Sequence, residues 1–250
     1  MQTLKLMPLL TASCLALLLA SGCASTGGPE QGRDSHPQDP FEPVNRAVFG
    51  FNSVVDEFVL RPVAVGYETV TPKPMRWNIR NFFDNVTYPV TIANLALQGK
   101  LGDSAHASGR FLANSTFGLL GLFDVATVMG LERHNEDFGQ TLGVWGIEES
   151  PYLVLPFLGP STVRDGIGRF PDSYLFDPLS IYTRENTDYG PMALDLIQTR
   201  QQFLSQDQEI RQAVDPYAMM RDAYLQRRDF LIRDGETETL DYESMLEDYD

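Results

Sequence analysis

The stretch from Phe111 to Leu131, FLANSTFGLLGLFDVATVMGL, constrains the fold of this chain more than any other. Its 21 residues hold one charged side chain, Asp124, and an apolar helix needs ~20 residues to span a bilayer. Three glycines interrupt it, each weakening a helix by roughly 1 kcal/mol. A central aspartate costs ~2.5–3.5 kcal/mol on membrane-insertion scales. We therefore expect a break near Gly118–Gly121, with two short pieces lying in or dipping into one leaflet and Asp124 facing protein or a pore.

The N-terminal residues are typical of a bacterial secretory signal. Lys5 precedes an apolar run that ends in LASGC at residues 19–23, which resembles a lipobox. We expect residues 1–22 to be a lipoprotein signal peptide and Cys23 to be the lipid attachment site, the alternative being an ordinary signal peptide with a chance cysteine. Ala24, where an aspartate would favour retention, predicts the outer membrane by the sorting rule of enterobacterial lipoproteins.

Composition changes twice along the chain. Residues 23–38 are rich in Gly, Ser, Pro and charge, which predicts a flexible tether on the lipid anchor. Residues 39–233 carry the apolar patterns and predict one domain. Residues 234–250 hold eight acidic residues and no basic one, so we expect a disordered acidic tail. The whole chain has a formal net charge of −15, which argues against nucleic-acid binding through a positive field.

Apolar residues at three-and-four spacing predict amphipathic helices along the domain. The first is expected over 44–59, ending at Arg61-Pro62 because a residue before proline disfavours helix. A second is expected over 74–86, where Tyr88-Pro89 interrupts. A third is expected over 92–97, with a stop at Gly99.

The pattern is less regular after Gly99, and several elements are expected there. They are a helix capped by Asp103 or Ser104, a hairpin of strands 141–145 and 152–155, turns over 169–186, and helices over 189–204 and from Pro216.

Residues suited to catalysis are few. Ser161 lacks the Gly-x-Ser-x-Gly pattern of a hydrolase and is better interpreted as an N-cap of the turn that follows. His134 precedes two carboxylates, Glu136 and Asp137, but without metal-ligand spacing, so we expect a solvated polar turn. His106 is expected on a helix surface or interface. No nucleotide fingerprint occurs, so we expect no catalysis, no cofactor and no metal.

Six motifs occur in order along the predicted domain. They are DPFEPVNRAVFGFN at 39–52, RPVA at 61–64, LQG at 97–99, RFLANSTFGLLGLFDVA at 110–126, EDFGQTLG at 136–143 and SPYLVLPFLGPSTVRD at 150–165. Together they resemble the MlaA/VacJ outer-membrane lipoproteins. Ser150 departs from the family pattern, which usually has glycine before the Pro-Tyr pair.

This resemblance implies a non-enzymatic, all-α protein. Its single domain would be a ring of amphipathic helices in the inner leaflet of the outer membrane, with a Gly-rich irregular or hairpin segment, on the periplasmic face. An amphipathic pore through the ring would remove mislocalised glycerophospholipid from the outer leaflet and maintain lipid asymmetry. The implied partners are a trimeric porin and a soluble periplasmic carrier similar to MlaC, which serves an ATP-driven inner-membrane complex.

Two alternatives to lipid transport stay open at this point. One is a lipid-anchored periplasmic hydrolase or phospholipase that uses Ser161 or the His134 loop. The other is a purely structural envelope lipoprotein.

The matching motifs carry polar and aromatic residues that the resemblance assigns either to the pore lining or to contacts that lock the ring. They are Asn45, Arg46, Phe51, Asn52, Arg61, Arg110, Asn114, Asp124, Asp137, Gln140, Arg164 and Asp165. For Arg164 and Asp165, buried Arg–carboxylate locking is the favoured interpretation.

Overall fold

The structure, a computed structural model, describes residues 36–147 and 150–235. Helices predominate, together with one two-stranded hairpin, which confirms the mainly helical fold class. The described helices and strands belong to one unit, which begins at His36. The predicted signal peptide, Cys23, most of the tether and the tail after Gly235 lie outside the described residues. Over 36–147 and 150–235, no helix combines the length and apolar character that crossing a membrane requires.

The first helical run is longer than the sequence predicted. Helix α2 (Glu42–Val55) continues through a π-helical turn, η2 (Asp56–Leu60), into α3 (Arg61–Val70). The expectation that Arg61-Pro62 ends the helix is therefore wrong. The Arg61 amide donates to the Asp56 carbonyl, five residues back, so the hydrogen-bond register has already changed where Pro62 lacks its N–H. Pro62 then occupies the second position of α3, directly after this change of register.

Helix α4 (Lys73–Leu97) is one continuous element that contains Pro89, so the predicted interruption is wrong. An internal proline costs a helix about 3 kcal/mol, because it removes a hydrogen bond and crowds the preceding turn. Tertiary packing offsets this cost. Tyr88 and Leu95 of α4 form an apolar cluster with Ala107 of the following helix.

Helix α5 (Leu101–Thr116) follows the predicted stop at Gly99, which the structure confirms with a φ of 80°. The predicted cap is wrong, because α5 begins before Asp103 and Ser104 and has no side-chain cap. The Ser104 hydroxyl instead donates to the Ile92 carbonyl and so ties α5 to α4.

The 111–131 stretch is broken, as the sequence predicted. Residues 117–123 form successive turns, and α6 (Val125–Val128) follows. Leu119 and Leu120 have φ values of 52° and 59°, in the left-handed region that non-glycine residues rarely adopt. The Asp124 side chain caps α6.

Two glycines explain why the break occurs where it does. A Cβ on Gly118 would lie 2.2 Å from the Phe123 carbonyl oxygen, so no larger residue fits this turn. Gly121 has a φ of 93°, and a Cβ there would lie 2.4 Å from the Asn85 Cβ. The glycines therefore allow the turns to fold back closely against α4 and α5.

The hairpin differs from the predicted one. Residues 141–145, expected as a strand, belong largely to helix α7 (Phe138–Val144), which begins where Asp137 accepts a hydrogen bond from the Gln140 amide. Strand β1 (Tyr152–Leu155) occurs as predicted, but its antiparallel partner is β2 (Gly159–Thr162).

Helices also replace the turns predicted over residues 169–186. They are α8 (Val163–Pro171), the π-helical turn η3 (Asp172–Phe176) and α9 (Pro178–Asn186). Pro178 lies at the first position of α9, which favours proline, and Pro171 lies inside the helical run, where α8 passes into the π-helical turn η3.

The predicted helices near the C-terminal end are confirmed. They are α10 (Gly190–Gln202), followed by η4 (Leu204–Gln206) and α11 (Asp207–Gln212), and then α12 (Pro216–Ile232), which starts at the predicted proline.

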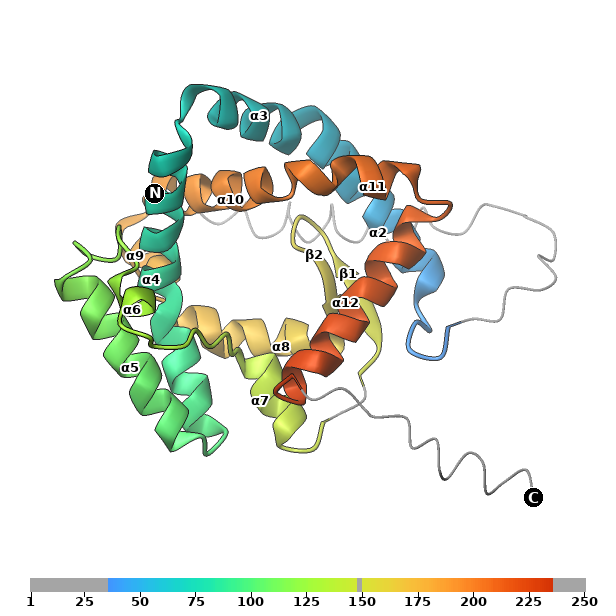
Figure 1. Cartoon of the computed structure of the whole chain (residues 1–250). Coiled ribbons are helices and arrows are strands. Elements are labelled where there is room, and N and C mark those ends of the chain that lie inside the picture. Colours follow the sequence, from blue (N-terminus) through green and yellow to red (C-terminus); the bar gives the residue numbers. More distant parts are fainter. Residues whose placement is uncertain (1–35, 148–149, 236–250) are drawn as a thin grey trace, which may run out of the picture. The chain divides into compact units, whose positions relative to one another are not determined.

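The contacts between these elements close into a circuit within the unit that begins at His36. From α2 and η2 the circuit passes to α3, α10 and α4, then through η3 and α8 to the hairpin, and β1 returns to α2. Figure 1 shows α3 at the top of the view, α4 at the left, α8 below, and the hairpin with α12 towards the right. Helix α5 packs against α4.

Apolar packing is divided between two small clusters. One joins α4 to α5, and the other joins α2, β1 and α12 through Tyr152, Val154 and Tyr217. Among the described residues, buried polar and charged side chains outnumber buried apolar ones. Polar contacts therefore hold many of these elements together, whereas in most soluble domains a single apolar core does so.

Candidate functional site

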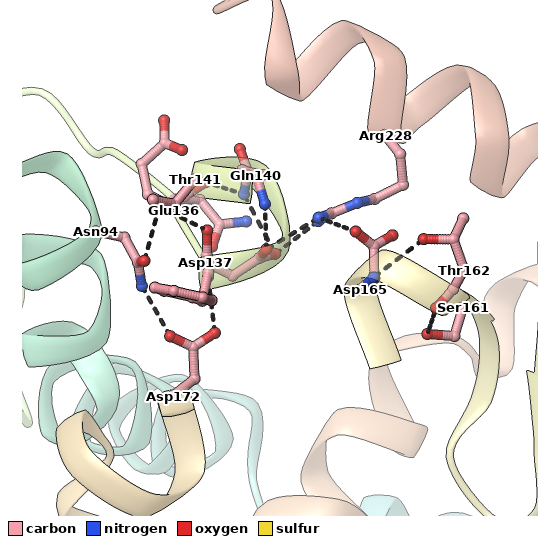
Figure 2. Close-up of polar contacts among 12 residues, drawn as sticks. Asn94, Glu136, Asp137, Gln140, Thr141, Ser161, Thr162, Asp165, Asp172 and Arg228 are labelled. Carbon is pink, nitrogen blue, oxygen red and sulfur yellow. Dashed lines mark hydrogen bonds and ion pairs between the residues drawn. The ribbon is translucent and has the colours of Figure 1, made fainter. Parts of the chain in front are cut away.

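Arg228 lies at the centre of a buried polar cluster that joins three helices (Figure 2). Its guanidinium donates to both carboxylate oxygens of Asp137, at 2.6 and 2.9 Å, and to Asp165 Oδ1 at 2.8 Å. Because these residues come from α12, the N-cap of α7 and the first turn of α8, they fix three elements together. We call Asp137, Asp165 and Arg228 the Arg228 cluster.

The surroundings of both carboxylates in the Arg228 cluster affect pKa values. Burial alone would raise the pKa of Asp137, but the hydrogen bonds and charge of Arg228 outweigh it and hold that pKa below its usual value. Tyr224 donates its hydroxyl to Asp165 Oδ2 at 2.7 Å, and burial beside this carboxylate raises the pKa of Tyr224. Such a cluster stabilises one arrangement of the helices as long as every charge keeps its partner.

Two glycines permit α7 and α8 to approach closely enough for the Arg228 cluster to form. A Cβ on Gly139 would lie 2.5 Å from Asp165 Oδ1 and 2.9 Å from Arg228 Nη2. A Cβ on Gly168 would lie 2.5 Å from the backbone nitrogen of Gly139. The two backbones therefore touch directly at this point.

Asn94 of α4 extends the polar network towards η3, as Figure 2 shows. It donates to Asp172 Oδ1 and accepts from the Thr141 hydroxyl, both at 2.8 Å. Asp172 also accepts from the Phe138 amide at 2.9 Å. Burial raises the pKa of Asp172. The network thus connects α4, α7 and η3 without an apolar core between them.

Sequence reasoning missed Asn94, Asp172 and Arg228. A usable signal existed, because Arg228 follows Tyr224 by four residues on the inward face of α12, where an apolar residue is expected. Asn94 likewise lies between the apolar residues of α4. A polar residue within an apolar helical stripe indicates a buried polar contact.

Two asparagines of α2 hold the hairpin. Asn45, fully buried, donates to the Tyr152 carbonyl at 3.0 Å and accepts from the Val154 amide at 2.9 Å. Asn52, two helical turns later, donates to the Leu155 carbonyl and accepts from the Phe157 amide. Each amide side chain therefore pairs with the edge of β1 as a neighbouring strand would.

The start of the described domain is joined to its last helix. Arg46 donates to both carboxylate oxygens of Asp215, at 3.1 and 2.7 Å, and lies over the Tyr217 ring at 4.3 Å. Asp39 accepts from the Tyr217 hydroxyl and from Asn45. Hydrogen bonding to Arg46 lowers the pKa of Asp215 to about 2.

Arg110, Asn114 and Asp124 meet beneath the broken stretch, and we call them the Arg110 cluster. Arg110 Nη2 donates to Asp124 Oδ2 at 2.5 Å, and Asn114 donates to Asp124 Oδ1 at 3.1 Å. Burial would raise the pKa of Asp124, but hydrogen bonds from Thr127 and Asn114 lower it overall. Asp124 is therefore turned towards protein, one of the two orientations that the sequence allowed.

Of the remaining predicted site residues, Arg61 and Phe51 lie apart from these clusters, whereas Gln140 and Arg164 contact the carboxylates of the Arg228 cluster. Their contacts are Arg61 to Asp207, Phe51 edge-on to Phe157, Gln140 to the Asn135 carbonyl, and Arg164 to Asp165 and the Ile147 carbonyl. The twelve predicted positions are thus distributed over several separate junctions of the circuit.

The candidate catalytic residues are built into the fold. Ser161 is fully buried in β2, and its hydroxyl donates to the Thr162 carbonyl. The N-cap of α8 is Thr162, so the predicted cap was wrong by one residue. Glu136 is also buried, which contradicts a solvated turn. In the part of the chain that the structure describes, no group of three His, Cys, Asp or Glu side chains suits a metal ion.

Large apolar side chains are exposed on many elements of the described domain, the reverse of a typical soluble domain. Those more than half exposed include Val54 and Phe58, Val70, Met75 and Trp77, Leu112, Phe117, Leu120 and Val128, and Ile167, Phe170 and Leu175.

Comparisons with known proteins agree with this arrangement. A family model described as MlaA lipoprotein matches residues 37–231. The intermembrane phospholipid transport system lipoprotein MlaA of Escherichia coli is 38% identical over 231 residues, covering 91% of this chain and 90% of that protein. The protein of the same description from Haemophilus influenzae is 32% identical over 238 residues, covering 93% of each.

A solved structure gives the same fold. This structure is described as the structural basis for maintenance of bacterial outer membrane lipid asymmetry. Its chain is 39% identical to this one and superposes with a TM-score of 0.69. The match covers 78% of this chain and 98% of the solved chain.

Proposed function

The chain belongs to the MlaA lipoprotein family, and from this premise we propose that it removes mislocalised glycerophospholipid from the outer leaflet of the outer membrane. It is an outer-membrane lipoprotein of intermembrane phospholipid transport that maintains lipid asymmetry. The family consists of transport lipoproteins, not enzymes. Lipid movement then needs no bond chemistry from the buried Ser161 or from the His134 loop.

The observation that carries the proposal is the inverted distribution of side chains around a closed circuit. Large apolar side chains are exposed on the helices, while charged and polar side chains lie at the junctions between them. We propose that this circuit is a ring in the inner leaflet, around an amphipathic passage. Such a passage lets the headgroup keep polar neighbours and the tails keep apolar ones, which lowers the desolvation cost of transfer.

The polar junctions are proposed to keep the ring closed. The Arg228 cluster joins α7, α8 and α12, and Arg46 joins α2 to the N-cap of α12. Asn45 and Asn52 fasten the hairpin to α2. These contacts support a locking role for the predicted residues, because each one joins segments that are far apart in the sequence.

Attachment and partners complete the proposal. Cys23 would carry the lipid, with residues 23–38 as the tether of a domain that spans 39–233 and ends in an acidic tail. The lipid would pass to a soluble periplasmic carrier similar to MlaC, and a trimeric porin would hold the ring in place. Family membership supports the lipid attachment, the carrier and the porin, whereas the tether and the tail rest on the composition of the sequence.

Deletion of the gene tests the function directly. We expect deletion to increase the phospholipid of the outer leaflet, measured on intact cells with a membrane-impermeant reagent that labels exposed headgroup amines. The wild-type gene should restore the low level of labelling, and a Ser161→Ala variant should restore it equally. Unchanged labelling after deletion would contradict the proposed transport function.

A further inference from the structure

Residues 117–129 form a compact apolar projection, which we call the 117–129 lobe. Its large side chains are exposed to between 48% and 88%. They are Phe117, Leu119, Leu120, Phe123, Val128 and Met129. Exposed apolar groups of this size gathered in one short segment indicate a surface that is covered in the working protein.

Most backbone amides of the lobe have hydrogen-bond partners within the lobe or in α5. Amides of the turn region donate to carbonyl groups within residues 113–123; they are Gly118, Leu120, Gly121, Leu122, Phe123 and Val125. The Ala126 amide donates to the Asn114 side chain and the Thr127 amide to the Asp124 side chain. In a loop that faces water, backbone groups without a protein partner can form hydrogen bonds with water. A non-helical segment in hydrocarbon has no water to bond, so each unsatisfied group is costly there.

The charge of the lobe is turned inward. Asp124 accepts from Arg110 and Asn114, and the Thr127 hydroxyl also donates to Asp124. Arg110 in turn donates to the Leu131 carbonyl at 2.6 Å. The Arg110 cluster therefore closes the protein side of the lobe, and the apolar side carries no charge.

The leucines at the tip are held outward by an uncommon backbone conformation. Leu119 and Leu120 both have positive φ, and both side chains are more than 60% exposed. Glycine would adopt this conformation without strain. Two large apolar side chains at positions that favour glycine indicate that their exposure has a use.

We propose that the 117–129 lobe is a wedge that inserts its six apolar side chains among lipid acyl chains. This inference rests on the proposed function, because it requires a domain that lies at the outer membrane. Lipid is the occupant that the backbone indicates, since a protein partner would offer its own hydrogen-bonding groups to an open loop. The wedge sets how deeply this side of the domain enters the leaflet.

Depth-dependent quenching tests the wedge. The mature lipoprotein is reconstituted in vesicles of phosphatidylethanolamine and phosphatidylglycerol, with an environment-sensitive fluorophore on Leu120→Cys or, separately, on Phe117→Cys. The matched control is Glu209→Cys, on an exposed position of α11. Nitroxides on the acyl chains should quench both lobe probes about threefold more than the control, and iodide should quench them about threefold less, because hydrocarbon excludes the ion.

Two results would overturn the inference. One is iodide quenching that is equal at the lobe and at position 209. The other is a lobe probe that becomes shielded only after a trimeric porin is added, which would assign the lobe to a protein interface. Either result could occur while gene deletion still raises surface phospholipid, so failure of the wedge is distinguishable from failure of the transport function.

Discussion

At the residue scale, single buried polar side chains join elements of this protein that apolar packing would join in most soluble domains. Asn45 is the clearest case, since one fully buried amide group bonds Asp39, the Tyr152 carbonyl and the Val154 amide. Removing such a side chain leaves several buried partners without hydrogen bonds. That loss costs more than the hydrogen bonds themselves contribute.

Replacement of Asn45 should therefore destabilise the protein strongly. We expect Asn45→Ala to lower the free energy of unfolding by about 3 kcal/mol, because buried groups of β1 lose their partners. The half-buried Asn52 offers the matched control, and Asn52→Ala should cost about 1 kcal/mol because its partners reach water. Denaturant titration of the detergent-solubilised protein measures both, and equal effects would contradict the argument.

Backbone strain at the lobe should respond in the opposite direction. Leu120→Gly should raise the free energy of unfolding by up to ~1 kcal/mol, since relief of the left-handed conformation exceeds the added entropy of the unfolded chain. Leu112, which is 59% exposed against 68% for Leu120 but lies within α5, is the control, and Leu112→Gly should lower the free energy of unfolding by about 1 kcal/mol. Thermal unfolding compares the two variants; a destabilised Leu120→Gly protein would count against strain.

At the element scale, the sequence located most helices but misjudged their ends. Apolar spacing predicted α10 and α12, and the glycines predicted the break after α5. Pro62 and Pro89 were misread as helix ends because local rules omit what surrounds a proline. A π-helical turn accommodates the first, and packing against α5 stabilises the helix around the second.

The candidate sites show the same limit of local information. Motifs identified Asp137 and Asp165, yet their common partner Arg228 lies 91 and 63 residues away in the sequence. Neither carboxylate has a local pattern that indicates this arginine. Contacts that join distant elements follow from the closure of the circuit, which a single sequence does not display.

The junction of α7 and α8 yields a prediction with an internal control. Gly168→Ala should lower the free energy of unfolding by about 3 kcal/mol, because its Cβ would overlap the backbone of Gly139, which cannot rotate away. Gly166, in the same helix, has no neighbour nearer than 3.8 Å to an added Cβ. Gly166→Ala should therefore stabilise by about 0.5–1 kcal/mol. Denaturant titration checks the pair, and similar values for both would contradict direct backbone contact.

At the scale of the whole molecule, ion pairs connect the two ends of the described domain. Arg46 near the start of α2 binds Asp215 at the N-cap of α12, 169 residues later. Arg221 of α12 likewise approaches Asp39, at 3.4 Å. Closure between the two ends of the described domain therefore depends on the ionised carboxylate of Asp215.

Acid should loosen this closure. The pKa of Asp215 is about 2 in the folded chain, lower than the ~3.9 of a free aspartate, so its contribution is complete above ~pH 5 and is lost as the pH falls towards 2. Solvent screening leaves about 1 kcal/mol for this pair. Unfolding measured between pH 6 and 2 should show a loss that Arg46→Met diminishes. Arg80→Met, at the long 3.6 Å pair with Asp84, should leave the pH dependence unchanged.

The late position of α12 in the chain sets the order in which the protein is completed during export. Tyr217 fills the apolar cluster of α2 and β1, and Arg228 neutralises carboxylates at α7 and α8. Until these residues leave the translocation channel, α2, β1, α7 and α8 lack the contacts that α12 supplies. We therefore expect these junctions to form only after α12 has been translocated.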